Sequence, residues 1–239
     1  MIQISDTIKH IIIVNVLFFA AKLSIDTISI DAIFNLHYFE NPRFHSWQLV
    51  TSIFMHASIG HIFFNMLGLY FFGTPLEQQW GRNKFLFFYF SAGIGANLIY
   101  TLHNYIEFES CVSFLNSVGA SKAYLLQLFN DSKILIDYKQ SEEAFIIYNT
   151  PLLGASGAIF GLLAAYAWYY PNAEIYLYFV IPAKAKYFIP VIVIADLISG
   201  ITGQPLLSPV NTAYFAHVGG AIIGLIIAYF WKKNQYRIY

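Results

Sequence analysis

Charge is scarce in this sequence. Of 239 residues only 13 are Lys or Arg and 13 are Asp or Glu, so 11% are charged, whereas a soluble domain carries about 25%. This is too little charge to cover a water-facing surface, and a soluble globular protein is excluded. The 58% of hydrophobic residues indicates an integral membrane protein whose surroundings are the lipid bilayer.

Cysteine and basic clusters are also lacking. Cys111 is the single cysteine, which excludes an intramolecular disulfide and a cysteine-based zinc site. The formal net charge is zero and no block rich in Lys and Arg occurs, so nucleic acid is not an expected partner. Scarce charge together with 23 Phe and 18 Tyr excludes intrinsic disorder.

Six segments are apolar enough for membrane-spanning helices, which need about 20 residues, or fewer where a helix starts below the membrane surface. They are 10–24, 57–77, 85–104, 151–170, 187–201 and 212–231. The first has no small-residue cleavage site before Lys22, so we expect an uncleaved helix and not a signal peptide. No internal repeat divides the chain, and residues 1–239 are expected to form a single all-α polytopic membrane domain.

Basic residues concentrate on one side of these six spans, which predicts the orientation. With the N-terminus inside, the inner side receives eight of the thirteen: Lys9, Arg82, Lys84, Lys184, Lys186, Lys232, Lys233 and Arg237. The outer loops hold the other five among nine acidic residues. Both termini are therefore predicted to be cytoplasmic. A compact core without an evident transit peptide favours a bacterial inner membrane.

Two outer connections are long. The first, about 25–56, carries Trp47 and several Phe and Tyr among polar residues, a composition typical of the headgroup boundary. The other, the third loop at about 105–149, has an apolar cluster at 124–129 and is expected to hold one short amphipathic helix. Its role is open between a lid or substrate contact and a tolerated insertion.

Polar side chains inside a membrane are costly, so each is a candidate for function. His61 and Asn65 are four residues apart and share one helix face. Both can donate to one anion, although a hydrogen-bonded pair between helices that serves only stability is an equal alternative. A metal site is disfavoured because no Glu lies between helical histidines and no third ligand is evident.

Ser156 lies in a glycine-rich segment that opens the fourth span. Gly157 and Gly161 form a face of small residues that lets another helix approach, and this packing role is the simpler explanation of the segment taken alone. The soluble hydrolase motif Gly-x-Ser-x-Gly is excluded because Ala158 stands where it requires glycine.

His217 precedes Gly219, Gly220 and Gly224 in the sixth span. Taken alone, it is a buried histidine satisfied by a neighbouring carbonyl. If the glycine faces of the fourth and sixth spans pack together, the Ser156 hydroxyl and His217 come within reach of each other, as nucleophile and base for acyl transfer. His61, Asn65 and the Ser156 N–H would then be donors to an oxyanion.

These residues together resemble the rhomboid family of intramembrane serine proteases. The resemblance covers about 40–231 and rests on three patterns in the order of the family. They are His56-Ala57-x-x-x-His61-x-x-x-Asn65, Gly154-x-Ser156-Gly157 and Ala216-His217-x-x-Gly220-x-x-x-Gly224. Trp47, Thr51 and Phe54 also resemble the family where the first loop ends.

The resemblance implies a six-helix rhomboid-like bundle with an interfacial first loop and a long third loop. It implies a Ser156–His217 dyad without a carboxylate, an oxyanion site at His61, Asn65 and the Ser156 amide, and no cofactor or metal. Gly154, Gly157, Phe160 and His56 would support this site. Its substrates would be single-span membrane proteins, cut near the outer end of a helix that has locally unwound.

The sequence departs from the family pattern at two positions. Gln48 stands where the family often has Arg, which puts the polar contacts of the first loop in question. Phe160 stands where some members have Tyr stacked on the catalytic histidine, so the ring is kept and the hydroxyl lost.

Asp196, in the fifth span, belongs to none of these patterns. We expect it in a wet cavity or paired with Asn211 or Thr202, and not in the chemistry. Two other functions stay open: a catalytically silent rhomboid-like protein that binds helices, and a small-solute transporter, for which inverted repeats and broken spans are missing. The sequence says nothing about the oligomeric state.

Overall fold

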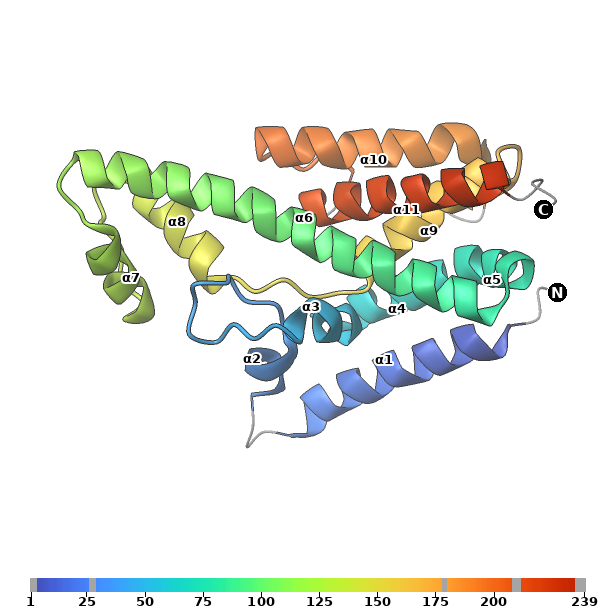
Figure 1. Ribbon diagram of the computed structural model, residues 1–239, viewed down its shortest axis with the longest axis horizontal. Helices are drawn as coiled ribbons and strands as arrows, with labels where there is room; N and C mark the ends of the chain where they lie inside the picture. The colour runs from blue at the N-terminus through green and yellow to red at the C-terminus, as the bar shows by residue number, and fades with distance from the viewer. Residues whose placement is uncertain (1–3, 26–28, 178–179, 208–211, 235–239) are drawn as a thin grey trace.

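The structure is a computed structural model that describes residues 4–25, 29–177, 180–207 and 212–234. It is a bundle of helices (Figure 1). The α-helices are α1 Asp6–Ser24, α2 Ile30–Phe34, α3 Gln48–Thr51, α4 Ile59–Gly68, α5 Thr74–Trp80, α6 Arg82–Ser117, α7 Lys122–Asn130, α8 Lys139–Asn149, α9 Ser156–Tyr169, α10 Ala185–Thr202 and α11 Tyr214–Asn234. The remaining elements are a 3₁₀ turn η1 (Ser52–Phe54), a π-helical turn η2 (Leu69–Gly73) between α4 and α5, and a hairpin of β1 (Glu174–Leu177) and β2 (Ile181–Lys184).

A helix occupies each of the six segments expected to span the membrane. Five of them are long and apolar enough to cross a bilayer: α1, the helix 59–80 that joins α4 to α5, α6, α10 and α11. The sixth, α9, has 14 residues and measures about 21 Å, which is shorter than a hydrocarbon core of about 30 Å. The prediction of an all-α polytopic membrane protein is confirmed.

The helix α9 lies inside the bundle, packed against α11, α6 and α10. It is apolar on all sides, which is typical of a helix surrounded by others. The start of α1 and the end of α11 lie at one end of the molecule, whereas α7 and α8 lie at the opposite end (Figure 1). The two terminal helices therefore present their chain ends on the side away from the third loop.

The backbones of α9 and α11 touch. A Cβ on Gly220 would overlap the carbonyl group of Gly157, with its carbon atom 2.7 Å away, and a Cβ on Gly224 would lie 2.5 Å from Cα of Gly161. These glycines are four residues apart on each helix, so one small face of α9 meets one small face of α11. The contact brings the start of α9 against the start of α11.

The third loop differs from its prediction. The helix α6 does not end near residue 104 but continues to Ser117, for 36 residues or about 54 Å, which exceeds the thickness of a hydrocarbon core of about 30 Å. Two helices follow, α7 and α8, and not one. The extension is stable because its Phe108, Val112 and Leu115 are buried in a second apolar cluster with Leu125 and Phe129 of α7.

Two other boundaries differ for local reasons. The second span runs from Ile59 to Trp80 and includes the π turn η2, which ends two residues before Pro75, a residue without an N–H for the helix ladder. The fourth span begins at Ser156 and not at 151, because residues 151–155 are not helical. The four-residue strands β1 and β2 are not predicted, since each is too short to show an alternating pattern.

Candidate active site

The segment before α9 fixes where Ser156 stands. Leu152 pairs with Leu36 of the first loop through two backbone hydrogen bonds of 2.8 and 2.9 Å, and the N–H of Gly154 donates to the carbonyl of Ser52 at 2.9 Å. Gly154 has a φ of +124°, a backbone conformation that favours glycine. The turn at Gly154 makes Ser156 the first residue of α9, where backbone N–H groups have no helical partner.

His217 lies on α11 and is 7% exposed. Its Nδ1 is 2.6 Å from Oδ2 of Asp196 on α10. The ring of Phe160 stacks on the imidazole, with centroids 4.0 Å apart and planes inclined by 11°. This contact occupies Nδ1 of the imidazole and leaves Nε2 as its other ring nitrogen.

Ser156 lies on the face of α9 that meets His217. Ser156 and Phe160 are four residues apart on this helix, so they share a face. The ring of Phe160 stacks on the imidazole of His217. A Cβ on Gly157 would also lie 3.5 Å from the carbonyl oxygen of Ala216, the residue before His217. The packing of α9 on α11 thus places Ser156 and His217 on facing helix surfaces, but the structure records no hydrogen bond between these two described residues, so their pairing stays a prediction.

His61 and Asn65 lie on α4 beside this point. A Cβ on Gly154 would be 2.9 Å from Nε2 of His61 and 3.7 Å from Oγ of Ser156, so both side chains border the same small space. Nδ1 of His61 accepts a hydrogen bond of 3.2 Å from the N–H of Ala57, which leaves the proton on Nε2. Asn65 follows one turn later and is 6% exposed, and its buried Nδ2 has no hydrogen-bond partner among the residues that the structure describes.

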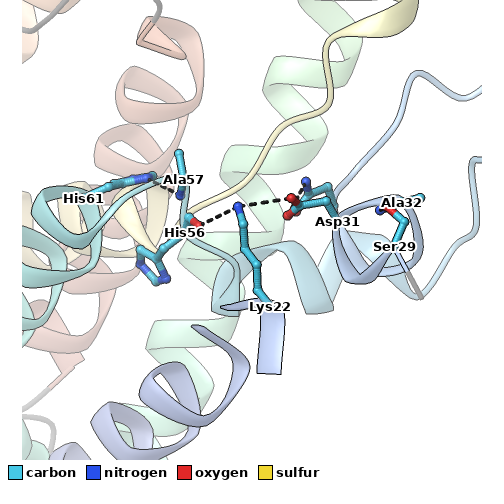
Figure 2. A network of polar contacts seen from close by, with 8 residues as sticks. Lys22, Ser29, Asp31, Ala32, His56, Ala57 and His61 are labelled. Atoms are coloured by element: carbon cyan, nitrogen blue, oxygen red, sulfur yellow. Dashed lines mark hydrogen bonds and ion pairs between the residues drawn. The ribbon is translucent and has the colours of Figure 1, made fainter. Parts of the chain in front are cut away.

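His56 links this site to α1 and the first loop. Lys22 bridges Asp31 of α2 at 3.1 Å and the carbonyl oxygen of His56 at 3.1 Å, as Figure 2 shows. The imidazole of His56 faces that of His61 edge to face, with centroids 5.0 Å apart. Burial, together with the nearby His61, lowers the pKa of His56 to about 4. His56 is thus neutral at physiological pH and holds the turn before α4.

Gln48 resolves the question about the first loop. It is fully buried and its amide group makes four hydrogen bonds within this loop. Its Oε1 accepts from the N–H groups of His37 (3.3 Å) and His45 (3.1 Å). Its Nε2 donates to the carbonyls of Ile33 (3.2 Å) and Arg43 (2.9 Å). A neutral amide supplies donors and acceptors together, so the loop is ordered without an arginine at this position.

Asp196 is the residue whose place the sequence does not predict. Thr202, one of its two expected partners, donates instead to the carbonyl of Ile198, and Asn211 lies outside the described residues. The carboxylate of Asp196 is 1% exposed and lies against His217. The sequence does carry a signal for this contact. An acidic residue inside an apolar helix needs a polar partner, and His217 is a polar residue of the next span along the chain.

In the described parts of the chain, no three His, Cys, Asp or Glu side chains converge in a way that could hold a metal ion.

Comparisons with known proteins agree with these patterns. The family model for the Rhomboid domain matches residues 43–129 and 132–234. RHOMBOID-like protein 12, mitochondrial, of Arabidopsis thaliana is 29% identical over 205 residues, 85% of this chain and 51% of the relative. An uncharacterized mitochondrial rhomboid protein of Schizosaccharomyces pombe is 29% identical over 79% of this chain and 52% of its own length. Rhomboid protease AarA of Providencia stuartii is 30% identical over 80% of this chain and 59% of the relative.

The chain thus spans between about half and three fifths of the length of these curated relatives. Two of the three are named as mitochondrial proteins, so the expectation of a bacterial inner membrane gains no support from them. The multi-pass membrane location is supported by the match to the Rhomboid domain and by the five apolar helices of spanning length. With most of its residues matched by the domain model and with relatives aligned over most of its length, this chain belongs to the rhomboid family.

Proposed function

We propose that this chain is an intramembrane serine endopeptidase with Ser156 as nucleophile and His217 as general base. The observation that carries the proposal is the arrangement of the His217 ring. It stacks on Phe160, one turn after Ser156, and its Nδ1 is engaged by Asp196. With Nδ1 engaged, Nε2 is the nitrogen proposed to accept the proton of Ser156, as nucleophilic catalysis by a hydroxyl requires.

The reaction runs in two stages. Oγ of Ser156 attacks the carbonyl carbon of the scissile bond, its proton passes to Nε2 of His217, and the carbonyl oxygen becomes an oxyanion. The C–N bond then breaks, and the imidazolium of His217 gives the proton to the leaving amine. Water attacks the resulting acyl ester with the same histidine as base, which releases the carboxylate product and restores the serine hydroxyl.

Three donors are available for the oxyanion. They are the Nε2–H of His61, the Nδ2–H of Asn65 and the backbone N–H of Ser156 at the start of α9. The N–H groups at a helix start also carry a partial positive charge that favours an anion. Donors fixed in advance stabilise charge that develops only in the transition state.

The proposed substrates are single-span membrane proteins cut near the extracytoplasmic end of their helix. In a helix each backbone carbonyl is hydrogen-bonded, so the scissile segment has to unwind before Ser156 can attack it. The helix α9 is too short to cross the bilayer, and a start below the outer surface would suit a peptide segment that enters from that side. The orientation follows from the basic residues near the inner helix ends and keeps both termini cytoplasmic.

The test is cleavage of a reporter that carries one membrane-spanning helix with a destabilised outer end. Wild type, Ser156→Ala and the control Ser91→Ala, which changes a partly buried serine of α6, are compared in the same membranes. We expect cleavage by wild type and Ser91→Ala and none by Ser156→Ala. Ser156→Ala should also lose covalent labelling by a serine-reactive phosphonate.

Two outcomes would contradict the proposal. Cleavage by Ser156→Ala at the wild-type rate would remove this serine from the mechanism. Absence of both cleavage and phosphonate labelling in the wild type, with capture of the reporter intact, would favour a catalytically silent helix-binding protein.

The oxyanion site has a separate test. Asn65→Ala is expected to lower kcat by about 10- to 1000-fold with little change in thermal stability, because one of several donors is lost. A kcat equal to that of the wild type would show that Asn65 is structural.

A further inference from the structure

The Asp196 carboxylate is buried in the apolar helix α10 and 2.6 Å from the imidazole of His217. Taking a carboxylate out of water into a membrane-spanning helix is costly, so such groups are retained where they have a defined partner. The contact uses Nδ1, the nitrogen that the proposed reaction does not need. This carboxylate therefore contacts the proposed base on the nitrogen opposite Nε2.

The packing of α10 on α11 fixes this contact. Gly200 lies one turn after Asp196 on the same face of α10. A Cβ on Gly200 would lie 2.8 Å from the ring of Phe215, two residues before His217. The ring of Phe215 in turn stacks on the imidazole of His103 of α6, with ring centroids 3.7 Å apart. The close approach at Gly200 sets the register at which Asp196 and His217 face each other.

We infer that Asp196 is a positioning residue for the base, so that the site works as a serine–histidine–aspartate triad and not as a dyad. The inference rests on the proposed function. Asp196 accepts the Nδ1–H of His217, which holds the tautomer with a bare Nε2 and the orientation of the ring. When Nε2 takes the proton of Ser156, the carboxylate stabilises the imidazolium without taking a proton itself.

The first test compares Asp196→Asn with the wild type in the full-length chain, with the single-helix reporter in the same membranes. An asparagine has nearly the same shape but offers an N–H or a neutral oxygen to Nδ1. We expect kcat to fall by about 10²- to 10⁴-fold, as tautomer loss does in a triad, while KM changes by less than about 3-fold because the substrate is not touched. Ser199→Ala changes another fully buried polar residue of α10, whose hydroxyl donates to Ala195, and is expected to keep the wild-type kcat.

The pH profile separates positioning from packing. Among the described residues, the ionisable groups that face His217 from other elements are Asp196 on α10 and His61 on α4. Without the carboxylate the imidazolium is less stable, so the acidic limb of the kcat profile should move to lower pH in Asp196→Asn. A variant that only loosens the packing would lower the rate at every pH and leave this limb in place.

A second measurement does not depend on a mutation. Nitrogen-15 NMR of the wild-type protein, labelled at histidine, reports which nitrogen of His217 carries the proton. We expect the Nδ1–H tautomer with a strongly deshielded proton. The Nε2–H tautomer would overturn the inference, as would an Asp196→Asn variant with wild-type kcat and an unmoved acidic limb.

These outcomes separate the two proposals. If the wild type cleaves, Ser156→Ala does not, and Asp196→Asn matches the wild type, the protease stands and the role of Asp196 is refuted. If the wild type neither cleaves nor is labelled by the phosphonate, the proposed function fails and the positioning role fails with it, whatever tautomer NMR finds.

Discussion

Replacing Gly220 by alanine tests whether the contact of α9 with α11 creates the site. The added Cβ would overlap the carbonyl oxygen of Gly157, and would lie 2.7 Å from its carbonyl carbon and 3.2 Å from its Cα. These are backbone atoms, which cannot turn aside as a side chain can. Since carbon atoms pack at about 3.5–4.0 Å, the two helices have to separate by about 1 Å at this point.

This separation acts on both stability and catalysis. Overpacking of a tight interior costs about 1–3 kcal/mol, so the thermal midpoint should fall while the protein stays folded at room temperature. Gly220 lies three residues after His217 and its contact lies one residue after Ser156. A displacement of about 1 Å between nucleophile and base is expected to lower kcat by about 100-fold.

The assay is reporter cleavage at equal amounts of folded protein, measured together with thermal unfolding in detergent. Gly60→Ala is the matched control, because Gly60 lies in the first turn of α4 and a Cβ there would meet only Ser58 Oγ, at 4.0 Å. It should leave kcat unchanged and raise stability by up to about 1 kcal/mol. If Gly220→Ala keeps the activity of Gly60→Ala, the close approach of α9 and α11 does not align the site.

Three further predictions follow from the surroundings of the site. Gln48→Ala should lower the stability by about 2–4 kcal/mol, since four backbone partners lose their hydrogen bonds; an unchanged midpoint in thermal unfolding would contradict this. In the unfolded chain His56 takes up a proton below its ordinary pKa of 6.5. In the folded protein the pKa of His56 is lowered to about 4, so this histidine stays neutral until the pH is that low. Acidification from pH 7.5 to 5 should therefore cost about 2 kcal/mol, and His56→Gln should remove that part of the pH dependence. Phe160→Leu loses the stacking on His217, so kcat should fall by about 2- to 10-fold with the substrate KM unchanged.

Much of the bundle could be predicted because helix–helix contacts in a membrane depend on local spacing. Glycines four residues apart on two spans predict that these spans touch, and the structure shows this contact between α9, which begins with Ser156, and α11, which carries His217. His61 and Asn65 follow from the same periodicity on α4. The helix faces that carry the candidate site residues could therefore be predicted from spacing within single helices.

The features that escaped prediction depend on how one helix is rotated or extended relative to another. Asp196 contacts His217 where Gly200 allows α10 to pack closely against Phe215. The rotation of α10 about its own axis that produces this packing cannot be predicted from the residue pattern of α10 alone. The extension of α6 to Ser117 is stable only through burial against α7. Hydropathy predicts which residues lie within the bilayer. It does not predict the last residue of a helix that continues beyond the bilayer.

The state of Asn65 bears on the choice between a structural and a chemical role for the α4 pair. A pair that serves only to join helices would use its donors in the resting protein. Nδ2 of Asn65 is buried and has no acceptor among the described residues. In His61, Nδ1 accepts the hydrogen bond from Ala57, and Nε2–H borders the space beside Ser156. Two donors that the described residues leave free beside Ser156 agree with the proposed oxyanion site, because the partner of such donors exists only during the reaction.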